Sequence, residues 1–185
     1  DVSYMAALPE LHPELAEAWL AVGYVEIPNA DFDANITRQG NPCGTAKEYC
    51  LVADSVGMLT ATNFDGTTSN YTTDFAGSSY TAPMVSGAIA LLKQAFPNHS
   101  AEQLTDRLLA SANNSWFTAQ GNTTFVTNGN GINHGYHATW GHGVPDVYAA
   151  LSPITSNSNA ASASSPSGSG GSGIVIIRYK KIVET

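Results

Sequence analysis

The amino-acid sequence predicts an α/β fold in which a mainly parallel sheet packs against one buried helix. Three short apolar runs bounded by polar loops, at 19–25, 50–54 and 58–62, are typical of buried strands. From Tyr80 to Phe96 apolar side chains recur at helical spacing, and apolar residues continue round the other side of this helix. Strands followed by a helix that is apolar all round favour a layered arrangement with the helix in the core.

A second helix and a hairpin are predicted after the central helix. Ser100 and Gln103 form a capping-box pattern, and apolar residues follow on one face of a helix over 101–112. We interpret this helix as a packing element. Residues 113–138 are polar and rich in Asn, Gly and Thr, which favours a hairpin or insertion with a strand near 123–127.

Ser79 is predicted to lie at the N-terminus of the central helix. Pro83 is tolerated only near a helix start, where its missing N–H would have no partner, and Pro97 ends the helix. A serine at this point can act as a nucleophile, because free backbone N–H groups and the helix dipole stabilise an oxyanion. A serine that only caps the helix is the alternative.

Composition argues against nucleic acid and membrane partners. The chain has 185 residues, 43% of them hydrophobic, and no run of 18 apolar residues, so we expect a soluble domain without a membrane span. The net charge is −8, and residues 1–153 hold four Lys or Arg against 14 Asp or Glu, which disfavours nucleic acid binding. The low charged fraction and the abundance of Ser, Thr, Asn and Gly favour a secreted protein.

The segment 75–87, Phe-Ala-Gly-Ser-Ser-Tyr-Thr-Ala-Pro-Met-Val-Ser-Gly, resembles the nucleophile motif of the subtilisin-like serine proteases, or subtilases. The resemblance implies part of a three-layer subtilisin-like fold, a serine endopeptidase activity on polypeptide substrates, and Ser79 as the nucleophile. Gly77, Ser78, Tyr80 and Pro83 match the supporting positions of the motif beside the substrate cleft. Ser78 replaces the usual Thr, and Thr81 replaces the usual Ala, which adds bulk beside the reactive serine.

Three further stretches resemble the same family. Residues 43–53 resemble a Cys-Gly-x-Ala-x-x-x-Cys-Leu stretch of many extracellular bacterial subtilases, and 140–151 resemble the pattern that closes the catalytic domain before a helix. Residues 19–25 resemble the strand that follows the oxyanion asparagine of the family. That asparagine would lie upstream of residue 1.

Cys43 and Cys50 are the two cysteines of the chain, too few for a metal cage and without clustered histidines beside them. We predict a disulfide between them, which implies an oxidising compartment and, with the resemblance, a secreted or cell-surface protein. Carboxylates such as Asp31 and Asp33 in the loop 27–42 could hold structural calcium, but their spacing matches no calcium loop. We therefore interpret 27–42 as a solvated loop, and no other cofactor is implied.

The acid and base that activate a subtilase serine are missing from the chain. The family order is Asp, His, Ser, yet His12 alone precedes Ser79, without the His-Gly-Thr surroundings of the family, and His137 follows it. His134, His137 and His142 fit no zinc spacing, and we interpret them as polar residues of a loop. We predict that residues 1–153 are the C-terminal half of a subtilase catalytic domain, inactive without the missing N-terminal half.

The C-terminal residues are predicted to lie outside the folded domain. Residues 154–173 form a Ser/Gly-rich linker that cannot bury a core, and 174–185 form a strand-like terminal segment with a basic end. This segment resembles the terminal strand of glycine-rich, fibre-like phage or surface proteins. The alternatives to a protease are therefore a non-catalytic surface or fibre-type binding protein with a vestigial protease segment, and a structural fragment without activity of its own.

Overall fold

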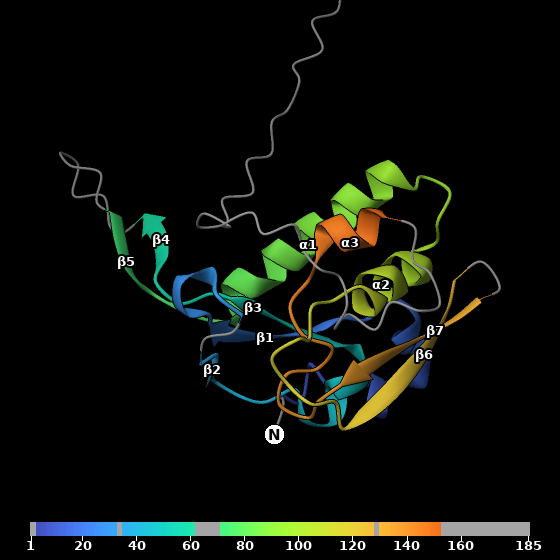
Figure 1. Cartoon of the computed structure of the whole chain (residues 1–185), viewed down its shortest axis with the longest axis horizontal. Coiled ribbons are helices and arrows are strands. Elements are labelled where there is room, and N and C mark those ends of the chain that lie inside the picture. The colour runs from blue at the N-terminus through green and yellow to red at the C-terminus, as the bar shows by residue number, and fades with distance from the viewer. Residues whose placement is uncertain (1–2, 33–34, 62–70, 128–129, 153–185) are drawn as a thin grey trace, which may run out of the picture.

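The computed structural model describes residues 3–32, 35–61, 71–127 and 130–152 of the chain (Figure 1). The predicted linker 154–173 and terminal segment 174–185 lie outside the described residues. Helices and strands are mixed along the described part, so the α/β class is confirmed. The elements in chain order are η1 Leu8–Glu10, η2 Pro13–Ala18, β1 Ala21–Glu26, η3 Pro28–Ala30, β2 Thr37–Gln39, η4 Gly44–Tyr49, β3 Cys50–Asp54, β4 Met58–Ala61, β5 Tyr71–Phe75, α1 Ser78–Ala95, α2 Ala101–Ala110, β6 Gly121–Thr127, β7 Asn130–Tyr136 and α3 Val147–Leu151.

The central sheet has the order β2-β1-β3. β1 and β3 pair in parallel from Ala21↔Cys50 to Val25↔Asp54, as predicted, and β2 pairs antiparallel with the second half of β1. Successive residues of a strand point to opposite faces, so Leu51 contributes to the core beneath α1, while Cys50 and Val52 belong to the core of the other face. The sheet therefore has two covered faces, which explains its continuous apolar strands.

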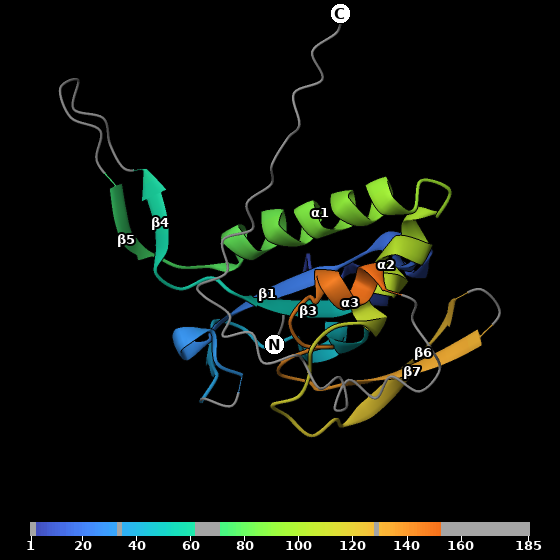
Figure 2. The same ribbon diagram turned by 45° about the horizontal axis from the view of Figure 1, so that its top comes forward.

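Helix α1 packs along β1 and β3 with α2 and α3 beside it (Figure 2). Its buried residues Thr81, Val85, Ala88 and Leu92 recur every three or four positions and form one face. Outside this face Ala82, Met84 and Ala90 are exposed. The prediction of a helix buried in the core therefore holds for one face only, although the sequence of the helix is apolar outside this face as well.

The strand predicted at 58–62 does not join the parallel sheet, so that part of the prediction is wrong. β4 pairs antiparallel with β5 in a separate two-stranded sheet. In both ribbon views this hairpin projects from the body near the start of α1 (Figures 1 and 2). Gly57, at a φ of +67°, precedes β4, and Leu59 is 72% exposed. An alternating strand with an exposed face suits a peripheral hairpin, and not the two-sided core of a parallel sheet.

The predictions for the later elements are confirmed. α2 begins with a capping box, in which the Gln103 backbone N–H donates to Ser100 Oγ and the Ser100 backbone N–H donates to Gln103 Oε1. β6 and β7 form an antiparallel hairpin over the predicted strand 123–127. Asp146 caps α3 by accepting the Ala149 backbone N–H at 2.8 Å.

Cys43 and Cys50 form the predicted disulfide, with their Cα atoms 6.0 Å apart. Both residues are buried in the second core, beside Ala46 of η4 and Val25 of β1. The disulfide therefore ties the start of η4 to the first residue of β3. Among the described helices, none combines the length and apolar character that a membrane crossing requires.

Candidate active site

Ser79 lies in the first turn of α1, and its side chain is exposed. The residue at the N-cap position is Gly77, with a φ of 150° and a ψ of 160°, and no side chain caps the helix. The alternative in which Ser79 caps the helix is therefore wrong. Within the part of the chain that the structure describes, the Ser79 hydroxyl forms no hydrogen bond, so it faces solvent at the positive end of an 18-residue helix.

Hydrogen bonds of the residues next to Ser79 fix the position of the first turn of α1. The Gly77 backbone N–H donates to the Ser55 carbonyl at 3.1 Å, and Thr81 shares a 2.9 Å hydrogen bond with the buried Ser55 hydroxyl. The sequence predicted that the extra bulk of Thr81 would lie beside the reactive serine. Thr81 is instead fully buried, so this bulk fills the core. The Tyr80 hydroxyl accepts a hydrogen bond from Thr60 of β4 at 3.2 Å. Gly77 and Tyr80 thus position α1, whereas Ser78 and Pro83 are exposed.

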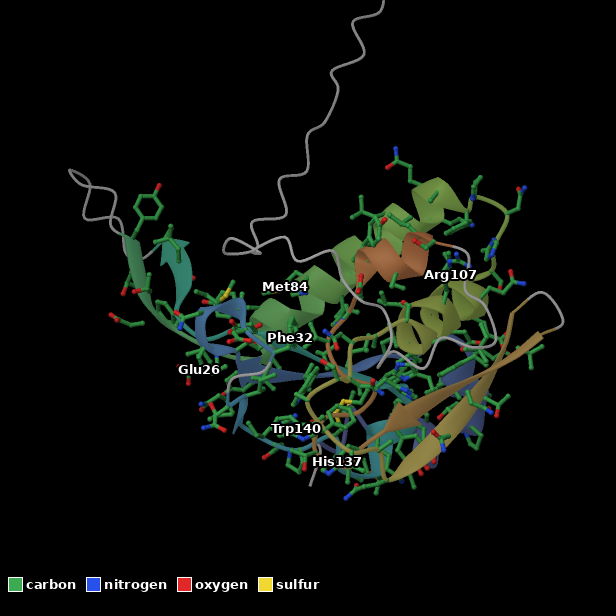
Figure 3. The ribbon with its side chains drawn as sticks, viewed as in Figure 1. Glu26, Phe32, Met84, Arg107, His137 and Trp140 are labelled. Atoms are coloured by element: carbon green, nitrogen blue, oxygen red, sulfur yellow. A yellow bond between two sulfur atoms is a disulfide. The ribbon has the colours of Figure 1, made fainter. Side chains whose placement is uncertain are left out.

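The two histidines considered as a base for Ser79 form no hydrogen bond with it among the described residues. His12 is exposed and contacts Glu14 at 3.2 Å. His137 accepts the Thr139 backbone N–H on Nδ1 at 2.9 Å and stacks near Trp140. His137 and Trp140 lie on the side of the molecule away from α1, which carries Met84 (Figure 3). The described residues therefore supply no acid–base partner for the serine.

His134 and His142 form a buried pair, so the interpretation of these two residues as polar loop residues is wrong. Their Nδ1 atoms are 3.0 Å apart, while Nε2 of His134 lies 2.9 Å from the Ala112 carbonyl and Nε2 of His142 lies 3.0 Å from the Glu48 carbonyl. Two neutral rings carry two N–H groups, so at most two of these three contacts are hydrogen bonds at one time. Burial lowers the pKa of both imidazoles, and the neighbouring His134 lowers that of His142 further, to about 3.

This neutral pair is expected to make the fold sensitive to acid. The unfolded rings have a pKa of about 6.5, so the stability that the pair contributes is complete above that pH. This stability falls as the pH decreases from about 6.5 toward about 3. The loss is about 1.4 kcal/mol per pH unit for each proton that the unfolded rings bind and the folded rings do not. Urea unfolding of the wild type and of His142→Gln measures the contribution. We expect the stability advantage of the wild type at pH 7.5 to shrink at pH 6 and again at pH 5.

The comparison of the wild type with His142→Gln also cancels the titration of Asp106, whose effect on stability opposes that of the histidines. Burial, followed by the charge of Glu102, raises the pKa of Asp106 to about 6. A raised carboxyl pKa stabilises the fold as the pH falls through this value, which is opposite in sign to the histidine effect. Because Asp106 is present in both proteins, its contribution cancels in the difference. A difference in unfolding free energy that stays constant from pH 7.5 to pH 5 would contradict the neutral pair.

Neither the possible structural calcium in the loop 27–42 nor the zinc alternative gains support from the geometry. Residues 28–30 and 37–39 of this loop form η3 and β2, while Asp33 lies outside the described residues. Over the described ranges, no three His, Cys, Asp or Glu side chains gather in a way that could hold a metal ion.

A cavity of about 290 Å³ lies beside the N-terminus of α1, and sequence reasoning missed it. Ser78 is in its wall together with residues of β1, β2 and the disulfide. Arg38 of β2 is also in the wall and is one of only four Lys or Arg among residues 1–153. The scarcity of cations in this acidic chain is the sequence feature that could have singled out Arg38.

Comparison with known proteins decides the family of the chain. The model of the subtilase family of peptidases matches residues 3–143, which is well over half of the chain and includes Ser79. The chain belongs to the subtilase family. The resemblance drawn from the nucleophile motif is therefore confirmed, and the family is one of serine proteases.

Two individual proteins resemble this subtilase over part of their length. Serotype-specific antigen 1 of Mannheimia haemolytica is 30% identical over 110 residues, which is 58% of this chain and 11% of that protein. The crystal structure of MycP1 from Mycobacterium smegmatis matches with a TM-score of 0.41 and 23% identity, covering 74% of this chain and 30% of MycP1. The chain thus spans about a tenth of the curated relative and under a third of MycP1.

Proposed function

We propose that this subtilase chain is the C-terminal half of a serine endopeptidase catalytic domain, in which Ser79 attacks the peptide carbonyl and forms the acyl-enzyme. One observation carries the proposal: in a chain of this family, the Ser79 hydroxyl is exposed and unbonded at the positive end of α1. A hydroxyl in that position can reach a substrate carbonyl. The free N–H groups of the first helical turn favour the negative charge that develops on the carbonyl oxygen.

The chain alone is proposed to be inactive. A serine hydroxyl is a weak nucleophile at neutral pH and requires an adjacent base to take its proton. None of the described histidines forms a hydrogen bond with Ser79: His12 contacts Glu14, His137 accepts the Thr139 backbone N–H, and the buried pair contacts backbone carbonyls. We therefore assign the base, its orienting carboxylate and the oxyanion asparagine to the N-terminal half of the domain.

An apolar groove between β1 and α1 supports docking of that N-terminal half. It has a volume of about 390 Å³ and is lined by Leu20 and Val22 from the strand side and by Ala82, Val85 and Ile89 from the helix. Ala82 in the wall of this groove is exposed, and Met84, which lies outside the groove lining on another side of α1, is 39% exposed. A helix that is apolar all round is normally buried all round, so a further layer of the same domain is the partner we propose.

The proposed compartment is extracellular or at the cell surface. The disulfide between Cys43 and Cys50 supports it, because such bonds persist in oxidising environments. The polypeptide substrate follows from the family.

Labelling with a fluorophosphonate probe tests the proposal. We expect the probe to label Ser79 in the complete catalytic domain of the parent protein, and to leave the isolated 185-residue chain unlabelled. If the isolated chain reacts at the rate of the complete domain, a residue within it, with His12 and His137 as candidates, supplies the base, and the half-domain proposal fails. If the complete domain does not react, the proposed activity fails, and a vestigial protease segment in a surface or fibre-type binding protein becomes the better hypothesis.

A further inference from the structure

Arg38 lies in the wall of the cavity beside α1 and has no charged partner among the residues that the structure describes. Its Nη1 donates to the Thr139 carbonyl at 2.8 Å, while Nε is buried and has no hydrogen-bond partner among the described residues. The ion pairs of the described part of the chain join His12 to Glu14 and Lys47 to Glu48, so neither involves Arg38. A half-buried guanidinium thus keeps its charge with one carbonyl contact and no carboxylate.

The position of the guanidinium is set by the backbone beneath it. Gly23 of β1 has no Cβ, and a Cβ added there would lie 2.7 Å from Nη2 and 2.8 Å from Nη1 of Arg38. The planar group therefore lies directly on the strand, in the space that the missing side chain leaves. Burial lowers the pKa of Arg38, and Tyr24 opposes that effect, yet the guanidinium stays protonated at neutral pH because arginine is not deprotonated in proteins.

The cavity lies within reach of the nucleophile. Its wall includes Ser78, which precedes Ser79 directly, and adjacent Cα atoms are about 3.8 Å apart. An extended peptide advances about 3.3 Å per residue, so a side chain one to three residues from the scissile bond would reach the cavity. The volume of about 290 Å³ is ample for one side chain.

We propose that this cavity is a subsite that takes the carboxylate of an Asp or Glu side chain of the polypeptide substrate, with Arg38 as the residue that determines this preference. The planar N–H fork of arginine matches a carboxylate better than any other ligand group in a peptide. The positive end of α1 at Ser78 adds to the attraction. The remaining charges of this half of the protein are mostly negative, so the preference comes from Arg38 locally and not from the overall field. This inference rests on the proposed peptidase function.

Two measurements separate the inference from the function on which it rests. The first compares kcat/KM of the complete catalytic domain on peptides that carry Glu or Gln at each position flanking the cleaved bond. We expect a preference of about 10- to 100-fold for Glu at one position, the range of a charge-assisted hydrogen bond. Arg38→Gln abolishes this preference, so that the Glu and Gln peptides are cleaved with the same kcat/KM, and Arg38→Lys retains part of it.

Two further variants control for charge and for position. Lys47→Gln removes the same charge from η4, where Lys47 contacts Glu48, and it leaves the preference intact. Gly23→Ala keeps the Arg38 charge but displaces the guanidinium, and it lowers the preference. Activity without any preference for Glu, or a preference that survives Arg38→Gln, overturns the inference and leaves the proposed function standing.

The second measurement needs no catalysis. N-acetyl-glutamate amide and N-acetyl-glutamine amide are titrated into the full 185-residue chain and followed by ¹H–¹⁵N NMR. We expect the glutamate probe alone to shift the amides of Gly23, Arg38 and Ser78, and we expect Arg38→Gln to remove these shifts while the rest of the spectrum stays folded. Equal shifts from both probes, or none, overturn the carboxylate site. Shifts from the glutamate probe with an inactive complete domain refute the peptidase function but leave the carboxylate site.

Discussion

Replacing Ser79 by alanine in the complete catalytic domain is expected to lower kcat by on the order of 10⁶-fold, because removal of a subtilase nucleophile leaves only binding and the oxyanion hole. KM should change little, since the hydroxyl acts on the reacting carbonyl and makes no other contact within the described residues. Steady-state kinetics on a peptide substrate measure both constants. Ser115→Ala is the matched control, because Ser115 is exposed and follows the end of α2, outside the nucleophile motif.

The size of the loss distinguishes a nucleophile from a supporting residue. Loss of a single polar contact beside a reacting group lowers kcat by about 10²- to 10³-fold. A loss of that smaller size in Ser79→Ala, with an adduct forming at another serine, would assign the nucleophile elsewhere. A similar loss in both Ser79→Ala and Ser115→Ala would indicate general damage to the fold.

Replacing Gly143 by alanine is expected to destabilise the chain by more than about 3 kcal/mol, the range of severe steric substitutions. Gly143 has a φ of +107°, and a Cβ there would lie 2.0 Å from the carbonyl oxygen of Asn113, which is backbone and cannot swing aside. The Gly143 carbonyl also accepts the Val52 backbone N–H at 2.9 Å, so displacement of this segment disturbs the edge of β3. Urea unfolding followed by circular dichroism measures the loss.

Gly87→Ala provides the matched control for this prediction. Gly87 lies inside α1, and apart from its chain neighbours and the backbone of its own helix, no heavy atom of the described residues lies within 4 Å of the position that its Cβ would take. Alanine favours a helix over glycine, so this variant is expected to gain up to about 1 kcal/mol. Equal unfolding free energies for Gly143→Ala and Gly87→Ala would show that the segment at Gly143 is not packed against Asn113.

The amino-acid sequence by itself determined the elements whose partners are close along the chain. Ser100 and Gln103 predict the start of α2 because the capping box spans one helical turn. Cys43 and Cys50 are only seven positions apart, and neither thiol has another partner in the chain. The nucleophile motif at 75–87 predicted the family, since its residue types are required at fixed positions of one loop and one helix.

Only the tertiary structure decided which distant segments meet. His142 contacts the Glu48 carbonyl 94 residues away, and Arg38 contacts the Thr139 carbonyl 101 residues away. The apolar pattern of 58–62 predicted a strand, but only the structure shows that this strand pairs with β5 and not with β3. The pattern of α1 likewise predicted an apolar surface without saying which of its faces the rest of the described chain would cover. A side-chain pattern specifies which surfaces must be buried, whereas the path of the folded chain selects what buries them, because many apolar surfaces satisfy the same pattern.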